Sequence, residues 1–430
     1  MSQTTITSGS NQESVLQGTM LATAFAGRKT NMFSLRGKFP KQTDAEGIIK
    51  GQTEPNMPIV VSKDLTAIKG GRIKTELVQP IGGYPIMGEA NASGKGDAQK
   101  FDTAELKIDL SVKIIDVGGK MTQQRSPWNL YNIAKSQGLG YHGKYEDQMC
   151  LVHLGGARGT HRNIEWLIRQ QSDPEFAEQC INPVKCPTKN RHFLATSSGI
   201  ERVAASGNEI SIATTDGLTM DVVDAIATQI EEMPLAPSPI MFPNDDQSTD
   251  KPMRVLLVSP AAYNNFLQSS NGLYRTYESY ALARGNTMGK HPLFGNGSLL
   301  FRDILIVQMN RFIRFSAGNA INWAANYNSE TETTTDLVPA AFSAAGYAVD
   351  RCILLGAQAL AVGYGGSDMN GSTFYIEEEH TNFNNKHEIA VGMINGVNKI
   401  RFNIDHGDSG KQYTDLGAMC IDTAVKVQVA

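Results

Sequence analysis

The sequence predicts an α+β fold, in which short apolar strands and helices follow one another along the chain. Two observations support this prediction: a pair of strands with strict apolar–polar alternation, and a long helical pattern that follows them directly. The chain has 430 residues, of which 41% are hydrophobic and 19% charged, so it can bury substantial cores. A chain of this length typically forms roughly two or three domains.

The first 65 residues show little regular periodicity, which predicts an extended arm. Within this arm, residues 28–41 (RKTNMFSLRGKFPK) alternate basic and apolar side chains. Such a segment either contacts a polyanion or an acidic neighbour, or docks its apolar side chains on its own domain. We favour docking, with the basic side chains in solvent.

Two alternating segments predict a projecting two-stranded ribbon. Residues 72–78 (RIKTELV) and 105–114 (ELKIDLSVKI) both alternate with period two, which indicates half-buried strands. The apolar positions of the second segment are Leu106, Ile108, Leu110, Val112 and Ile114. Residues 79–100 connect the two strands and hold five glycines and two prolines. A hairpin loop needs only about two to five residues, so a connection this long is unusual. Because an isolated ribbon is marginally stable, we expect it to pack against another surface.

A long helix is predicted over about residues 126–155. Ser126 is a good N-cap, and Pro127 fits the first helical position, where its missing N–H costs nothing. One apolar face recurs at spacings of three and four residues: Leu130, Ala134, Gly138, Tyr141, Tyr145, Met149 and Val152. Three glycines within it each cost about 1 kcal/mol relative to alanine, so the helix must depend on tertiary packing.

The rest of the chain mixes strands and helices after an irregular segment at residues 156–215. Helices are predicted at 218–233 and at 273–285, the second ended by Gly285. Predicted strands cover residues 254–260, 299–309, 311–315, 387–402 and 417–429. Residues 352–365 form either a strand or a buried helix, followed by a turn, and the acidic run 377–379 is expected in a solvated loop.

Composition limits the possible environments and partners of the protein. The formal net charge of −4 gives no global basic character that would indicate nucleic-acid binding. Five widely spread cysteines suggest reduced thiols rather than a disulfide framework. The N-terminus is unlike a signal peptide, and the longest apolar run is shorter than a membrane span. We therefore expect a soluble intracellular product without a membrane partner.

No residue pattern positively supports catalysis or a cofactor. Cys180, Cys186 and His192, with His161 nearby in sequence, could suggest zinc, but their spacing is looser than that of structural zinc sites. The sequence contains no nucleophile elbow, zincin helix or phosphate-binding loop motif. The segments NRHF (190–193) and RFIRF (311–315) could contact nucleic acid, but half-exposed strands show the same alternation. We therefore predict no cofactor, no metal and no enzymatic activity.

The ordered series of motifs resembles the major capsid proteins of tailed bacteriophages, specifically the family typified by the enquatro-like podoviruses (Schitoviridae). The resemblance extends from about residue 70 to the C-terminus. It rests on GGKMTQQRSP (118–127) before the long helix, then GARG (156–159), NPVKCPTKNRHF (182–193), HPLF (291–294), ILIVQMNRFIRF (304–315), HEIAVGMINGVNKIRF (387–402) and DLGAMCIDTA (415–424).

This resemblance implies the Johnson fold shared by tailed-phage and herpesvirus capsids. The parts would be an N-terminal arm (1–65), an extended hairpin loop (66–118), a peripheral domain with a spine helix and an irregular insertion (119–233), an axial domain (234–348), and strands returning to both domains (349–430). Many copies would form pentamers and hexamers that close into an icosahedral virion shell around double-stranded DNA. Assembly would occur in the host bacterial cytoplasm, with a scaffolding protein and a portal.

The resemblance also implies that function depends on contacts between subunits. Packaged DNA would be touched only weakly and without sequence specificity, and a decoration protein is a further possible partner. The residues that we expect at inter-subunit contacts are Gly82, Gly83, Tyr84, Lys95, Lys100, Ile108 and Arg125. Two alternatives stay open at this point: another phage structural protein of the tail or decoration type, and a Cys/His metallohydrolase.

Overall fold

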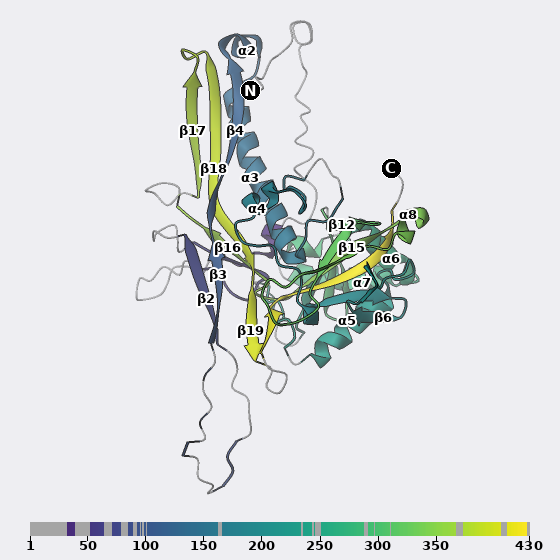
Figure 1. The fold of residues 1–430 in the computed structure, drawn as a ribbon. Coiled ribbons are helices and arrows are strands. Elements are labelled where there is room, and N and C mark those ends of the chain that lie inside the picture. The colour runs from purple at the N-terminus through teal and green to yellow at the C-terminus, as the bar shows by residue number, and fades with distance from the viewer. Residues whose placement is uncertain are drawn as a thin grey trace.

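The chain is described from a computed structural model, in which two large sheets meet at one long helix (Figure 1). The described residues are 32–38, 52–63, 71–78, 85–88, 93–94, 96, 99, 101–161, 166–233, 235–242, 245, 251–287, 291–295, 297–309, 311–366, 373–405 and 411–427. The α+β class predicted from the sequence is confirmed.

A five-stranded sheet stands beside the long helix α3 (Leu130–Gly155) (Figure 1). Its strands are β1 (Ile59–Ser62), β16 (Leu360–Tyr364), β18 (Lys386–Lys399), β17 (Phe374–Thr381) and β4 (Asp109–Gly119). The long β18 pairs with β17 on one side and with β4 on the other. Helix α3 covers one face, where Ala134 joins Val117 and Val391 in a buried cluster.

An eight-stranded sheet forms the second body. Its strands are β10 (Leu299–Phe301), β11 (Ile304–Gln308), β9 (Arg254–Val258), β15 (Tyr347–Leu355), β21 (Ala418–Lys426), β5 (His192–Thr196), β6 (Gly199–Arg202) and β12 (Ile313–Ser316). Alternation divides β15 between two cores: Leu354 faces one and Ile353 the other. Both faces of the sheet are therefore buried, which explains its nearly continuous apolar runs.

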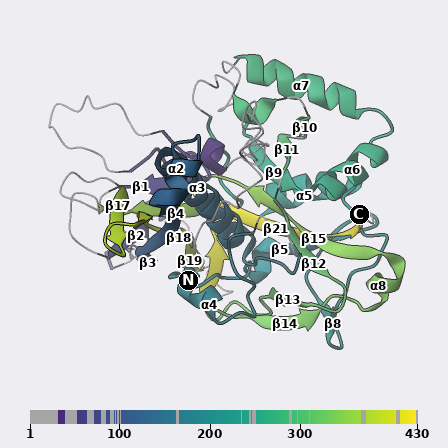
Figure 2. The same ribbon diagram turned by 90° about the horizontal axis from the view of Figure 1, so that it is seen from above.

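Three helices cover one face of this sheet, as the view from above shows (Figure 2). They are α5 (Met220–Glu232), α6 (Pro260–Ser269) and α7 (Tyr274–Thr287). Val223 of α5 and Phe266 of α6 are fully buried in the same cluster as Leu354. The last turns of α3 lie in the core on the opposite face, so this helix touches both sheets.

The smaller elements connect or flank these two bodies. Short strands form a four-stranded sheet: β13 (Ala320–Trp323), β14 (Thr334–Leu337), β8 (Glu209–Ile210) and β7 (Ala205–Ser206). Two-stranded pairs are β2 (Arg72–Val78) with β3 (Phe101–Lys107), and β19 (Arg401–Asp405) with β20 (Lys411–Asp415). The short helices are η2 (Met32–Leu35), α2 (Lys120–Arg125), α4 (Glu175–Gln179), η3 (Lys189–Arg191), η4 (Pro292–Phe294) and α8 (Ala341–Ala345).

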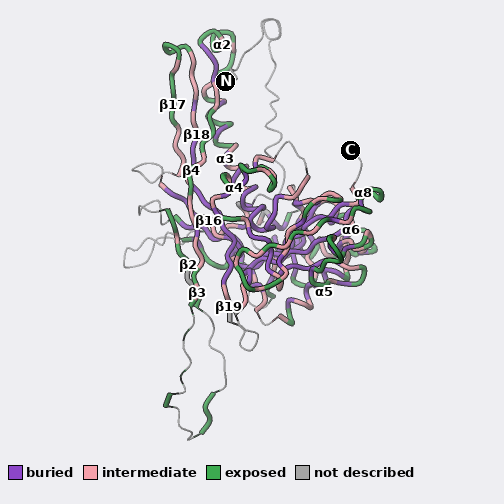
Figure 3. The backbone as a smooth tube through the Cα atoms, viewed as in Figure 1, coloured by how far each residue is buried: buried purple, intermediate pink, exposed green. Residues whose placement is uncertain are grey.

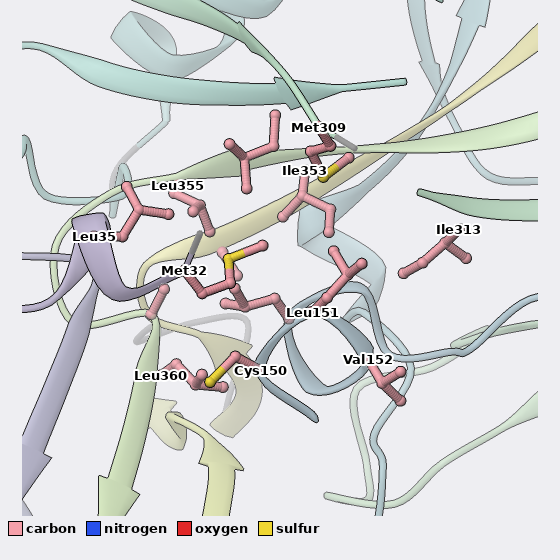
Figure 4. Packing of buried hydrophobic residues seen from close by; sticks show 14 of the residues in the cluster. Met32, Leu35, Cys150, Leu151, Val152, Met309, Ile313, Ile353, Leu355 and Leu360 are labelled. Atoms are coloured by element: carbon pink, nitrogen blue, oxygen red, sulfur yellow. The ribbon is translucent and has the colours of Figure 1, made fainter. Parts of the chain in front are cut away.

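The described part of the N-terminal arm docks its apolar side chains on its own chain, as favoured from the sequence, but Arg36 is largely buried rather than in solvent. Met32 and Leu35 lie in the largest core beside Cys150 and Leu151 of α3 (Figure 4). The neighbouring Arg36 donates to Glu146 at 2.7 Å in a largely buried ion pair. Burial opposes the charge of Arg36, but Glu146 raises its pKa. Arg36 therefore fixes this segment of the arm to the long helix.

The start of α3 differs from the prediction. The helix begins at Leu130 rather than near residue 126, and Asn129 is its N-cap, accepting from the backbone N–H of Asn132. Ser126 instead ends the separate helix α2, and its Oγ accepts from Trp128 N at 3.2 Å. Two good capping residues lie within four positions, and the turn through Trp128 selects the second.

No helix among the described residues is long and apolar enough to cross a membrane.

Tertiary contacts correct two further predictions and decide between the two alternatives left open for residues 352–365. Gly285 does not end its helix but lies inside α7, where an added Cβ would come within 2.4 Å of Phe294. The acidic run 377–379 is exposed but belongs to strand β17, because it pairs with β18. The ambiguous run 352–365 contains the end of β15 and all of β16, so it is strand rather than helix.

Buried charges lie where α3 meets the eight-stranded sheet. Arg351 donates to Asp422 through Nε at 2.7 Å and Nη2 at 2.9 Å, and to the carbonyl of Gly155 at 2.9 Å. His192 Nε2 lies 2.7 Å from Asp422. Burial disfavours the charge of Asp422, but Arg351 and His192 hold its pKa well below the usual range. Burial lowers the pKa of His192.

His153 in the last turn of α3 is buried without a hydrogen-bond partner on either ring nitrogen. Burial, with smaller contributions from Lys399 and Lys185, lowers its pKa to about 3. The unfolded chain therefore binds a proton here between about pH 6.5 and pH 3 that the folded chain does not bind. His153 therefore costs almost no stability above pH 6.5, and its effect lowers the free energy of unfolding as the pH falls through this window.

We predict that His153→Leu leaves stability near pH 7 almost unchanged and reduces acid sensitivity. Leucine removes two unpartnered nitrogens, and its volume is similar. Between pH 7 and pH 5 the free energy of unfolding of the variant should fall by about 2 kcal/mol less than that of the wild type. Denaturant unfolding at the two pH values measures this difference. Equal losses in the two proteins would contradict the assignment.

Candidate functional site

The projecting ribbon is formed by β2 and β3, which pair antiparallel from Arg72–Lys107 to Val78–Phe101. The predicted second strand at 105–114 is therefore two strands. Residues up to 107 pair with β2, whereas β4 begins at Asp109 and pairs with β18. Sequence periodicity continues through this junction because both strands are extended, so alternation alone could not reveal the change of partner.

Polar side chains and glycines hold the base of the ribbon on the five-stranded sheet. The side-chain amide of Asn182 pairs with the backbone of Lys107 as a neighbouring strand would. It accepts from Lys107 N at 3.0 Å and donates to Lys107 O at 2.8 Å. Asn398 donates to Glu105 O at 2.7 Å. At Gly396 an added Cβ would come within 1.9 Å of Lys107 O, so only glycine allows this approach. The ribbon therefore leaves the body in a fixed direction.

The far end of the ribbon is exposed. Val78 and Phe101, which form its last described pair, have exposed fractions of 58% and 59%. In the connecting segment, Ile86 and Met87 are also exposed. Figure 3 shows the ribbon extending away from the buried body of the chain. Five of the predicted contact residues lie outside the described residues: Gly82, Gly83, Tyr84, Lys95 and Lys100.

The two remaining predicted contact residues lie in different surroundings. Ile108 is half-buried, and its methyl groups lie against Gly363 and Gly365 of its own chain. Arg125 is exposed at the end of α2, at the far end of the five-stranded sheet. The structure thus does not bring these two side chains together. Their roles between subunits stay a prediction.

One face of β4 is apolar and about half-exposed. Leu110, Val112 and Ile114 point away from α3 and have exposed fractions of 50%, 45% and 62%. By register, Val112 lies beside Gly392, over which the ring of Tyr375 is packed. We call the row of Leu110, Val112 and Ile114 the open face. The alternation predicted that these side chains lie on the buried face of a half-buried strand, but α3 covers the opposite face, through Ile115 and Val117.

A pocket of about 270 Å³ lies at the edge of β4, between this strand, α3 and α4. Its walls include Tyr141 and Tyr145, whose rings are stacked with centroids 6.3 Å apart. Burial raises the pKa of both phenols, so they remain neutral at physiological pH. Because the pocket opens beside Leu110 and Val112, the open face continues into a recess.

The residues considered for zinc have separate partners. Cys186 lies 3.0 Å from Glu332 O, Cys180 lies 3.9 Å from the sulfur of Met149, and His192 contacts Asp422. Burial raises the pKa of the Cys180 thiol to about 12, which disfavours a metal-binding thiolate. His161 stacks on Phe312. No three histidine, cysteine or acidic side chains among the described residues are arranged around a common metal position.

The two aromatic–basic segments are also used internally. In NRHF, Arg191, His192 and Phe193 are all buried. In RFIRF, Arg314 forms a bidentate pair with Asp350 at 2.6 and 2.8 Å. These cations therefore stabilise the fold rather than offer a free surface to a phosphate backbone, as favoured from the sequence.

The five-stranded sheet beside the long helix α3, the second body and the projecting ribbon form the arrangement that the resemblance to phage capsid proteins led us to expect. The sequence matches the phage capsid protein family over residues 5–427, and the chain belongs to this family. It is a major capsid protein of the phage head shell, located in the virion. No curated protein sequence matches the chain.

Solved capsid structures share the Johnson fold with this chain. The capsid of Ralstonia phage GP4 is 21% identical over 100% of both chains, with a TM-score of 0.67. The capsid of cyanophage Pam1 is 16% identical, covers 96% of this chain and 100% of its own, and has a TM-score of 0.58. For the head of Helicobacter pylori bacteriophage KHP40 the identity is 9%, the coverage 92% and 90%, and the TM-score 0.54. These likenesses concern the fold.

We predict effects of different size for the same substitution at Ile108, which is half-buried, and at Ile114, which is on the open face. Ile108→Asp places a charge against Gly363 and Gly365, and should lower the free energy of unfolding by about 2–3 kcal/mol. Ile114→Asp lies on the open face and should change it by no more than about 0.5 kcal/mol. Denaturant unfolding of both variants as unassembled chains provides the measurement. Similar losses at both positions would contradict the described burial.

Proposed function

We propose that copies of this chain form pentamers and hexamers through the ribbon and the open face, and that these close into an icosahedral shell around packaged double-stranded DNA. The observation that supports this best is the presence of two uncovered apolar surfaces on one chain. The ribbon exposes Val78 and Phe101, and β4 exposes the open face. Isolated apolar residues on a surface are ordinary, but an aligned row with an adjoining pocket favours a protein partner.

The ribbon is built to reach a neighbour. Asn182 and Asn398 hydrogen-bond to its base, which fixes the direction in which the strands leave the body. Residues 79–100 are rich in glycine and polar residues and cannot form a core of their own. We propose that this segment lies across the next subunit, where Gly82, Gly83, Tyr84, Lys95 and Lys100 contact it. Arg125 would make a separate contact at the far end of the sheet.

The open face supplies a matching surface on the receiving subunit. Full burial of a Val, Leu or Ile side chain contributes about 1.5–3 kcal/mol, and these three are about half-exposed. The row would therefore contribute about 3 kcal/mol per contact. Such a contact is weak alone, which permits errors to be corrected, and becomes strong when each subunit makes several contacts in a closed shell.

The finer assignments rest on the family resemblance. We propose the Schitoviridae type, assembly in the host bacterial cytoplasm with a scaffolding protein and a portal, a possible decoration protein, and only weak contact with DNA, in keeping with the net charge of −4. We keep the domain ranges 1–65, 66–118, 119–233, 234–348 and 349–430 as proposals. The eight-stranded sheet draws strands from the last three, so these ranges divide the sequence more sharply than the sheets do. We propose function through surfaces rather than catalysis.

Shortening the ribbon tests the proposal. Replacing residues 82–100 with Asn-Gly should leave the isolated chain almost as stable as the wild type, because a tight turn can still join the two strands. Closed shells should become rare or fragile in electron micrographs, even when scaffold is co-expressed. Normal, heat-resistant shells from this variant would show that the tip is not an assembly element.

A glycine–serine replacement of the same 19 residues serves as the matched control. It retains the length of the connection but removes Tyr84, Lys95 and Lys100. If side-chain contacts matter, this variant should assemble as poorly as the shortened one. If it assembles normally while the shortened variant fails, only the reach of the ribbon is required, and the individual residue assignments are wrong.

A further inference from the structure

We propose that the recess of about 270 Å³ at the edge of β4 binds a primary alkylammonium group and, on the basis of the proposed function, that Lys95 of a neighbouring copy of this chain supplies it. Three exposed carboxylates line the recess: Asp109 of β4, and Glu175 and Glu178 of α4. Among its described lining residues there is no lysine or arginine. The recess is therefore acidic and lacks a cation in its own walls.

Neighbouring cations offset only part of this negative charge. Arg169 Nη2 lies 2.9 Å from Glu175 Oε2 at the rim. Within the described part of the chain, neither Asp109 nor Glu178 forms an ion pair. A cation that enters the recess would therefore be attracted by two carboxylates.

The wall of the recess also holds a buried hydrogen-bond acceptor. His142 is fully buried, and its Nε2 lies 2.8 Å from the carbonyl oxygen of Val391. A carbonyl can only accept, so Nε2 carries the proton, and in the neutral ring Nδ1 is an acceptor. This Nδ1 has no hydrogen-bond partner among the described residues. A buried polar atom without a partner is rare, and here it favours a ligand that donates hydrogen bonds.

The remaining walls suit the alkyl part of such a ligand. Tyr141, Tyr145 and Met149 line the recess with two aromatic rings and a thioether. Aromatic rings attract ammonium groups, and Lys113 Nζ already lies 5.2 Å from the centroid of the Tyr141 ring. A lysine side chain can bury its four-carbon stem along apolar surface while its ammonium donates three hydrogen bonds. The lining thus matches an alkylammonium group in both shape and charge.

The sequence offers a lysine suited to entering a recess on another surface. Lys95 lies in the ribbon connection between Gly94 and Gly96. Gly94 has a φ of +79°, a left-handed conformation that favours glycine in turns. Because neither neighbour of Lys95 carries a side chain, the backbone on both sides can approach a rim closely.

The position of the recess favours a lysine from another copy. Asn182 lines the recess and hydrogen-bonds to Lys107, so the recess lies at the base of the ribbon. The connection begins beyond the pair of Val78 and Phe101, about 20 Å further along the strands. The ribbon extends away from the body of its own chain (Figure 3). We therefore assign the ammonium to the ribbon of the next subunit.

The first test uses the unassembled full chain, with n-butylammonium as the probe and n-butanol as its neutral control. Titrations followed by ligand NMR should show that the alcohol binds about tenfold more weakly, because it lacks the charged donor. Glu178→Gln should weaken binding of the ammonium about threefold, the size expected for one exposed ion pair. Glu377→Gln makes the same charge change on β17, away from the recess, and should bind as the wild type does.

The second test exchanges the two charges in shell assembly. Lys95→Glu and Glu178→Lys should each reduce the yield of closed shells in electron micrographs about tenfold, because a small loss at one contact is multiplied over many contacts. The Lys95→Glu/Glu178→Lys double variant should regain most of the yield. Lys100→Glu makes the same change elsewhere in the connection, and Glu178→Lys should not rescue it. Unfolding of the unassembled Glu178 variants should match the wild type, since this side chain is exposed.

The outcomes separate this site from the proposed function. Absence of n-butylammonium binding, or equal weakening by Glu178→Gln and Glu377→Gln, would overturn the ammonium site. Binding of the probe without rescue in the double variant would overturn the assignment of Lys95. Normal shells from the variant with the shortened ribbon would instead contradict the proposed function, whereas binding of the probe is measured on the unassembled chain and does not depend on it.

Discussion

The buried guanidinium of Arg351 is the point on which the relation of the two sheets depends. It binds Asp422 of the neighbouring strand β21 and, at 2.9 Å, the carbonyl of Gly155 at the end of α3. A helix end leaves carbonyls without partners, and this arginine satisfies one of them inside the core. Removing one member of a buried ion pair typically costs about 3–5 kcal/mol, because the other charge stays unpaired. The contact of Arg351 with the end of α3 therefore helps to set the direction of this helix and of the five-stranded sheet beside it. Losing this contact would leave a buried charge or carbonyl without a partner.

A second buried group of charges fixes the ribbon indirectly. Arg401 donates to Asp415 at 2.7 Å, and Lys399 lies 3.5 Å from the same carboxylate. Burial disfavours the charge of Asp415, but the two cations lower its pKa. Lys399 ends β18 and Arg401 begins β19, so this carboxylate holds the strand on whose Gly396 the ribbon rests. The position of the ribbon thus depends in part on the buried ion pairs of Asp415 with Arg401 and Lys399.

Local secondary structure could be predicted from the sequence better than which strands and helices contact one another. The strand at 72–78, the long helix and most later strands follow from periodicity, which depends only on neighbouring residues. The change of partner at Ile108 could not be predicted, because strand pairing with β18 joins segments almost 300 residues apart. The N-cap at Asn129 and the internal position of Gly285 likewise depend on contacts with other elements. The ribbon residues were predicted to be inter-subunit contacts mainly through the family resemblance, whereas the open face became visible only when burial was known.

Alternation states which side chains of a strand share a face, but not which face another element will cover. In β4 both faces carry apolar residues: Ile115 and Val117 on one side, and the open face on the other. Such two-sided strands are usual where a sheet is covered on both sides. In this chain α3 is a single layer on one side, and the described residues place no helix over the other. The two-sided pattern of β4 is consequently that of an interior strand, which fits the proposal that another subunit supplies the second layer.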